Sequence, residues 1–290
     1  MVNKKPEWLI RRLPEKESLN KMEEMLVSLS LNTVCQEAKC PNIGECFKNK
    51  TATFMILGDI CTRQCKFCAV TKGEPTHPDP AEPKNVAKAV KKLGLKHTVI
   101  TSVTRDDLED GGAEHFVHTI KAVRKYNPKT SIEVLVPDFD GKENSIQKVI
   151  DAKPEIINHN LETVAALYSV VRPQAQYLRS LELLQRVKTK DSSILTKTGI
   201  MLGLGEKEEE VMGLVEDLVK IQCDILTFGQ YLRPTKEHLP VQEYVTPEKF
   251  QHYKEEAEKR GIKFVESGPF VRSSYNAAKG FDTLQNQENL

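Results

Sequence analysis

Six of the seven cysteines in this chain lie between Cys35 and Cys68, in two sets of three. The first set is Cys35-x4-Cys40-x5-Cys46, and the second is Cys61-x3-Cys65-x2-Cys68. Thiolates are soft ligands for zinc and for iron–sulfur clusters. Each set offers three ligands, one fewer than a tetrahedral metal or a cubane cluster takes. Each site therefore finds a fourth ligand elsewhere or leaves one position open for chemistry.

The second triplet is compatible with two kinds of metal site. A structural zinc knuckle is one, although such sites usually carry paired cysteines that total four ligands. A 4Fe–4S cluster held by three thiolates is the other, and its fourth iron can bind a small chelating molecule, as a catalytic zinc keeps a position free. Cys61 follows the first predicted strand closely, and this position favours an active-site cofactor.

Composition and charge narrow the class of protein. The 290 residues are 39% hydrophobic and carry a formal net charge of +1, which predicts a globular chain without long-range attraction to nucleic acid or membrane. The amino terminus lacks the apolar core of a secretory signal, and no stretch of about 18 apolar residues predicts a membrane span. We therefore expect a cytoplasmic protein, where clustered cysteines more often bind metal than form disulfides.

From residue 51 the sequence alternates between short β-branched runs and segments with helical spacing. This alternation predicts six strand–helix units with right-handed crossovers, as an open doubly wound sheet or as a partial (βα)6 TIM-like barrel, and we expect the partial barrel. In both architectures the chemistry lies at the carboxyl ends of the strands. The predicted strands are Thr53–Leu57, Thr98–Val103, Ile132–Val136, Ile156–Asn158, Lys197–Leu202 and Ile225–Gln230.

The segments outside this barrel complete the predicted organisation. Residues 1–50 are expected to form an arm over residues 1–20, a helix over 20–30 and a cysteine-rich stretch that is mostly loop. The partial barrel covers 51–262, and its last helix begins at Thr246-Pro247 and ends near Gly261. Residues 263–290 form a final strand, Lys263–Glu266, and a tail.

The second triplet resembles the signature of radical S-adenosylmethionine (SAM) enzymes, C-x3-C-x-aromatic-C, with Phe67 as the aromatic residue. The resemblance implies that SAM chelates the open iron of a 4Fe–4S cluster and is cleaved to a deoxyadenosyl radical. Residues 199–206, with Met201 and Gly203, resemble the adenine-contacting motif. Gly111 and Gly112 resemble the segment that holds the SAM amino group, although an inserted alanine separates them from Glu114. Glu162 and Arg172 are further candidates for SAM contacts.

The first triplet and the tail Arg272-Ser273-Ser274-Tyr275 together resemble the lipoyl synthase family. The segments Glu37–Ile43, Asn158–Thr163 and Gln230–Thr235 share the resemblance. It implies that Ser274 joins Cys35, Cys40 and Cys46 as the fourth ligand of an auxiliary 4Fe–4S cluster. Cys223 is the alternative fourth ligand, but it precedes an apolar run typical of a core position. Arg272 is expected to orient the tail or the substrate.

The family resemblance also implies a reaction and partners. Two sulfur atoms of the auxiliary cluster enter carbons 6 and 8 of an octanoyl group on a lysine of a lipoyl carrier protein. A ferredoxin or flavodoxin supplies electrons, and an iron–sulfur cluster carrier rebuilds the auxiliary cluster. Two rival hypotheses stay open: a radical SAM enzyme whose second cluster only transfers electrons, and a zinc-binding interaction protein.

Overall fold

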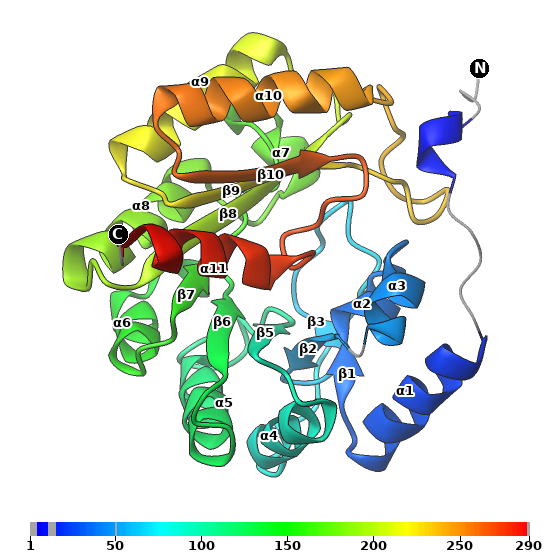
Figure 1. Cartoon of the computed structure of the whole chain (residues 1–290), viewed down its shortest axis with the longest axis vertical. Helices are drawn as coiled ribbons and strands as arrows, with labels where there is room; N and C mark the ends of the chain where they lie inside the picture. The colour runs from blue at the N-terminus through cyan, green and yellow to red at the C-terminus, as the bar shows by residue number, and fades with distance from the viewer. Residues whose placement is uncertain (1–4, 11–15, 50, 289–290) are drawn as a thin grey trace.

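A computed structural model describes residues 5–10, 16–49 and 51–288 of the chain (Figure 1). The helices are η1 (Glu7–Leu9), α1 (Lys16–Ser28), α2 (Val34–Glu37), α3 (Ile43–Lys48), α4 (Glu82–Leu93), α5 (Ala113–Tyr126), η2 (Phe139–Gly141), α6 (Glu143–Asp151), η3 (Ala165–Leu167), α7 (Tyr168–Val171), α8 (Tyr177–Lys190), α9 (Glu208–Lys220), α10 (Pro247–Arg260) and α11 (Ala277–Glu288). The strands are β1 (Asn32–Thr33), β2 (Thr53–Ile56), β3 (Ile60–Cys61), β4 (Thr71–Lys72), β5 (His97–Ser102), β6 (Ser131–Leu135), β7 (Ile156–Asn158), β8 (Leu195–Leu202), β9 (Ile225–Gln230) and β10 (Phe264–Gly268).

Eight strands form one curved sheet in the order β1-β2-β5-β6-β7-β8-β9-β10. All neighbours from β2 to β10 are parallel, and only β1 pairs antiparallel with β2. The order begins at β1 and ends at β10, so the sheet is an open barrel. The partial (βα)6 barrel predicted from the sequence is confirmed, with β10 as an additional parallel strand.

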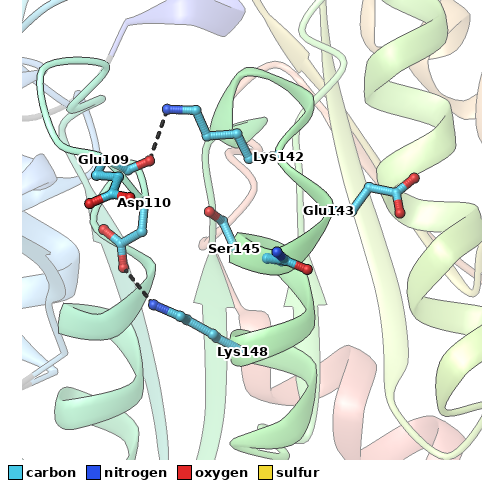
Figure 2. Close-up of a pocket in the computed structure, with 7 residues that line it drawn as sticks. Glu109, Asp110, Lys142, Glu143, Ser145 and Lys148 are labelled. Carbon is cyan, nitrogen blue, oxygen red and sulfur yellow. Dashed lines mark hydrogen bonds and ion pairs between the residues drawn. The ribbon is translucent and has the colours of Figure 1, made fainter.

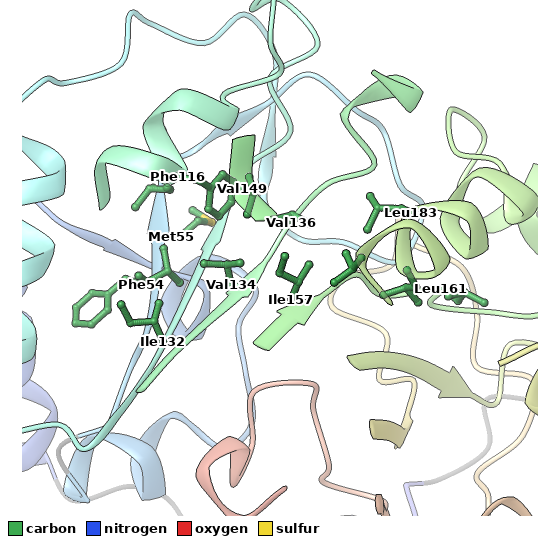
Figure 3. Close-up of a cluster of buried hydrophobic side chains, with 14 of the residues drawn as sticks. Phe54, Met55, Phe116, Ile132, Val134, Val136, Val149, Ile157, Leu161 and Leu183 are labelled. Carbon is green, nitrogen blue, oxygen red and sulfur yellow. The ribbon is translucent and has the colours of Figure 1, made fainter. Parts of the chain in front are cut away.

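The core lies between the sheet and the helices that surround it. Every residue of β2 and of β9 is buried, as expected for parallel strands covered on both faces. Figure 3 shows side chains of β2, β6 and β7, such as Phe54, Val134 and Ile157, together with Phe116 of α5, Val149 of α6 and Leu183 of α8. This packing fixes the outer face of the sheet and leaves the carboxyl ends of the strands to carry the site.

The two ends of the chain differ from the sequence-based prediction. The cysteine-rich stretch contains the short helices α2 and α3 where loop was expected, and α1 begins four residues earlier than predicted. Residues 1–4 and 11–15 of the predicted arm lie outside the described residues.

The tail contains α11, which we did not predict. Ala277, Phe281 and Leu284 keep helical spacing, and the last two pack against the starts of β7, β8 and β9.

A buried ion pair ties strands together near the amino ends of the barrel. Lys197 Nζ of β8 lies 2.9 and 3.0 Å from the two carboxylate oxygens of Glu133 of β6, and both side chains are almost fully buried. Asn158 donates to the same carboxylate. Burial opposes the charged form, but the charge of Lys197 outweighs it and holds the pKa of Glu133 well below its usual range.

None of the helices in the described part of the chain is long and apolar enough to cross a membrane.

Replacing Glu133 should destabilise the protein strongly. In Glu133→Ala the ammonium of Lys197 stays buried without its counter-charge, and we expect the free energy of unfolding in urea to fall by about 3 kcal/mol or more. Glu17→Ala, which breaks a fully exposed pair with Lys21, is the control and should change it little.

The same pair predicts a pH dependence with a defined sign. Because folding lowers the pKa of Glu133 from 4.5 to about 2, its stabilising contribution is fully present above 4.5 and is lost progressively as the pH falls from 4.5 through about 2. Glu133→Gln should therefore lose less stability than the unmodified protein as the pH falls below 4.5, measured as the free energy of unfolding in urea. The same decrease in both proteins would contradict the role given to Glu133.

Candidate active site

Both cysteine triplets line one cavity of about 740 Å³ at the carboxyl ends of the strands, and Ser274 lines it too. None of the seven cysteines, all of which are described, forms a disulfide. Cys223 is not among the cavity-lining residues, because it is buried just before β9, where its Sγ lies near the carbonyl oxygens of Thr196 and Ile225. The structure therefore brings six cysteines and one serine together and leaves Cys223 in the core.

The first triplet is carried by two short helices joined by a tight turn. Cys35 lies in α2 and Cys46 in α3, and Cys40 lies between them. The turn closes through a hydrogen bond from Cys40 N to Cys35 O, after Lys39 with a left-handed φ of 50°. Cys35 is buried, and burial raises the pKa of its thiol to about 12. Metal binding must therefore release this proton.

The second triplet leaves the barrel on a loop that follows β2. The loop begins at Leu57, which has a left-handed φ of 69° and is followed by Gly58. The buried carboxylate of Glu82 accepts the Leu57 N–H at 2.8 Å, and Arg105 donates to the Leu57 carbonyl. These two charged side chains, from α4 and from the segment after β5, hold the unusual backbone conformation that turns the chain toward Cys61.

A buried arginine holds the loop between Cys61 and Cys65. Arg63 contacts both carboxylate oxygens of Asp106 at 2.8 and 2.9 Å, and its Nη2 lies 2.6 Å from Asp138. Burial disfavours both charges, but their attraction raises the pKa of Arg63 and lowers that of Asp138 to about 2. Arg179 pairs with the other oxygen of Asp138. The loop is therefore attached to the segments that follow β5 and β6.

The thiols of the second triplet lie in a mixed environment. The backbone N–H of Thr104 donates to Cys61 Sγ at 3.3 Å, and such bonds tune the potential of a cluster. Burial raises the pKa of Cys68 to about 12, and it also raises that of Cys65 against the nearby charge of Arg172. The second triplet thus offers three soft sulfur ligands, one of which accepts a backbone N–H, and this environment suits a cluster iron.

Polar groups beside the second triplet lack partners among the described residues. Arg172 donates through Nη1 to the carbonyl oxygens of Asn160 and Leu161, but its buried Nε has no partner there. Asn160 Oδ1 is also buried without one. Burial raises the pKa of Glu162, and the charge of Arg172 opposes this effect. A polar, charged ligand such as SAM would satisfy these groups.

The other residues expected to contact SAM fall into two groups. Phe67 and Met201 line the cavity, together with Glu162 and Arg172. Gly203 does not, and its missing side chain serves another contact, because a Cβ there would lie 2.3 Å from Glu243 O. Gly111 and Gly112 also lie outside the cavity-lining set, and a Cβ on Gly112 would lie 2.3 Å from Leu57 Cδ1.

The Asp110-Gly111-Gly112 segment has a structural role at the start of α5. The Asp110 carboxylate accepts the backbone N–H groups of Gly112 and Glu114, and both glycines have positive φ. Asp110 also faces a second, polar hollow between α5 and α6, where Lys148 pairs with Asp110 and Lys142 donates to the Glu109 carbonyl (Figure 2). Its lysines are engaged with these neighbours, and it contains none of the predicted ligands.

Four residues that shape the site were not predicted from the sequence. Arg63 and Asn160 are described above, Asn42 Nδ2 donates to the Phe270 carbonyl, and Gly229 has no side chain where a Cβ would lie 2.2 Å from Val271 O. Asn42 lies between Cys40 and Cys46 of the first triplet, and Arg63 lies between Cys61 and Cys65 of the second. These positions in the sequence could have indicated that both residues belong to the site. Asn160 belongs to a segment that shares the family resemblance. The role of Gly229 could not be predicted from the sequence, because a single glycine in a buried strand does not show which part of the chain packs against it.

Comparison with known proteins agrees with this geometry. The family described as the radical SAM superfamily matches residues 55–218. Two solved structures share the fold at low identity. Streptococcus suis SuiB bound to S-adenosylmethionine has a TM-score of 0.56 and 14% identity and covers 86% of this chain and 61% of that one. A methylornithine synthase has a TM-score of 0.54 and 12% identity, covering 81% and 80%. The fold and the second triplet thus define a radical SAM enzyme.

Relatives that match nearly the whole chain identify the family more closely. The lipoyl synthase of Caldanaerobacter subterraneus subsp. tengcongensis is 59% identical over 97% of this chain and 98% of its own. That of Alkaliphilus metalliredigens is 55% identical over 97% of both chains. The chain belongs to the lipoyl synthase family, so it is a radical SAM sulfurtransferase that uses SAM and two 4Fe–4S clusters. The zinc-binding interaction protein considered above is not supported.

Arg63→Gln should weaken cluster binding at the second triplet only. The substitution removes the ion pairs with Asp106 and Asp138, so we expect the reconstituted protein to lose about half of its iron and sulfide. Arg63→Lys keeps the positive charge but loses the planar guanidinium group, so its iron content should lie between those of the unmodified protein and Arg63→Gln. Arg124→Gln breaks a partly exposed pair with Glu155 and is the control. A full complement of iron in Arg63→Gln would refute the positioning role.

Proposed function

We propose that this chain inserts two sulfur atoms at carbons 6 and 8 of an octanoyl group carried on a lysine of a lipoyl carrier protein. One observation supports this most directly: two separate thiol triplets and the C-terminal serine line the same cavity. A single cavity lets a carbon atom activated at one triplet meet a sulfur source at the other without leaving the protein. Membership in the lipoyl synthase family supports the same reaction.

Cys61, Cys65 and Cys68 would hold the cluster that binds SAM. When both are bound, the cluster and SAM would supply a one-electron cleavage of SAM, which yields the radical able to take hydrogen from an unactivated carbon. Asn160, Glu162 and Arg172 line the cavity and would bind the polar groups of SAM, and Asn160 Oδ1 and Arg172 Nε are buried without a partner among the described residues. Phe67, Met201 and Tyr231 line the same cavity and would exclude water from the reacting carbon.

Cys35, Cys40, Cys46 and Ser274 would hold the second cluster, whose sulfide is the sulfur source. A serine oxygen is harder than a thiolate and is therefore a weaker partner for a cluster iron. Ser274 Oγ can take up a proton and leave, which the three thiolates do less readily. Arg272 would orient the tail or the substrate beside it.

The three segments of the chain would divide this work. Residues 1–50 carry the ligands of the second cluster, residues 51–262 form the SAM-dependent barrel, and residues 263–290 return Ser274 to the cavity. The partners would be an octanoylated carrier protein, a ferredoxin or flavodoxin as electron donor, and an iron–sulfur carrier that restores the consumed cluster. We place the protein in the cytoplasm, where its thiols stay reduced.

Heavy-sulfur labelling tests the sulfur source. Protein reconstituted with labelled sulfide should give a lipoyl group with two labelled sulfur atoms in a single turnover. An unlabelled product would show that the second cluster only transfers electrons, which is the rival radical SAM hypothesis.

Ser274→Ala should separate SAM cleavage from sulfur insertion. The second triplet is untouched, so we expect deoxyadenosine formation to continue, while the lipoyl product falls by about 100-fold or more, the scale on which metal-site residues act. Ser273→Ala is the matched neighbour and should lose less than about tenfold. A normal yield of lipoyl product from Ser274→Ala would rule out the serine ligand.

A further inference from the structure

Helix α3 and the C-terminal segment 270–275 make two side-chain contacts that lie on either side of Ser273 and Ser274. Asn42, the N-cap of α3, donates through Nδ2 to the Phe270 carbonyl at 2.7 Å. Tyr275 Oη donates to Glu45 Oε1, in α3, at 3.0 Å. In Figure 1 the segment between β10 and α11 runs on the side of the barrel that carries α2 and α3. The two contacts are five residues apart in the tail and three apart near α3.

The first of these contacts is the less exposed. Asn42 is 1% exposed, whereas Tyr275 makes its contact at an exposed position, so the Asn42 hydrogen bond competes less with bulk water. Asn42 also accepts the Cys46 N–H through its backbone carbonyl. The residue that binds the tail is therefore built into the turn between two ligands of the first triplet, Cys40 and Cys46.

The opposite side of the tail lies against the barrel, where two strand positions have no side chain. A Cβ on Gly229 of β9 would lie 2.2 Å from Val271 O, and one on Gly199 of β8 would lie 3.4 Å from Ser273 Cβ. Asn160 donates to Ser273 Oγ at 3.2 Å from the SAM side of the cavity. The tail backbone is thus enclosed between α3 and the inner face of β8 and β9.

We infer that Asn42 and Tyr275 are positioning residues that hold segment 270–275 over the cavity without any bond made by Ser274. This inference rests on the proposed role of Ser274 and adds to it. A tail fixed on both sides of Ser274 lets the serine oxygen leave a cluster iron and return, while the backbone around it stays in place.

Hydrogen exchange of the cluster-free protein measures this directly. The amides of Val271 and Tyr275 are hydrogen-bonded within the tail and report on its docking. In Asn42→Ala we expect tail peptides to exchange about tenfold faster, since the hydrogen bond from the buried Asn42 side chain to Phe270 O is lost. Tyr275→Phe, at a more exposed contact, should give about a threefold increase.

Asn42→Asp separates hydrogen bonding from packing. The side chain keeps its shape but loses the amide donor, so tail exchange should rise as in Asn42→Ala, whereas a packing role predicts exchange like that of the unmodified protein. Asn127→Ala is the matched control, because Asn127 Nδ2 also donates to backbone carbonyls, of Ala87 and Val123, away from the tail. It should leave tail exchange unchanged.

Ser274→Ala distinguishes this inference from the proposed function. It should leave tail exchange in the cluster-free protein unchanged, even though it prevents sulfur insertion. Tail exchange in Asn42→Ala and Asn42→Asp equal to that of the unmodified protein would overturn the inference, whatever the activity of Ser274→Ala. If Asn42→Ala also loosens barrel peptides such as those of β8, Tyr275→Phe decides, and an unchanged tail in that variant overturns it.

Discussion

The site depends on the close approach of the C-terminal backbone to the inner face of β9. Val271 O occupies the space that a side chain at position 229 would fill, so only glycine admits the tail there. An open sheet makes this approach possible, because the side chains of a closed barrel fill its interior. The tail in turn brings Ser274 to the cavity that the cysteines line. The architecture thus joins residues more than 200 positions apart in one site.

Charge fixes the other side of the cavity. The loop of the second triplet has little regular structure, and its position is set by the buried contacts of Arg63 with Asp106 and Asp138 and by those of Glu82 and Arg105 with Leu57. Buried charges of this kind stabilise only when each is paired, so they specify one arrangement of the loop more than they add to stability. The two triplets are therefore held by different means, the first by short helices and the second by ion pairs.

The sequence predicted the barrel well, because parallel strands and amphipathic helices leave strong local patterns. Its two cysteine triplets line one cavity in the structure, and their division into two cluster sites stays a prediction. It carries no signal for a residue such as Gly229, whose partner lies far along the chain. Gly111 and Gly112 lie at the start of α5 and outside the cavity lining, and their contact with SAM also stays a prediction. Helix α11 was missed because its apolar face is short and packs only against strand ends.

We expect the two separate triplets in one cavity each to hold a four-iron cluster. An anaerobic count of iron and acid-labile sulfide per chain measures this. The intact protein should contain about eight of each, and about four of each should remain when Cys61, Cys65 and Cys68 are replaced together by alanine. A count of about four in the intact protein, or one that the triple replacement leaves unchanged, would contradict it.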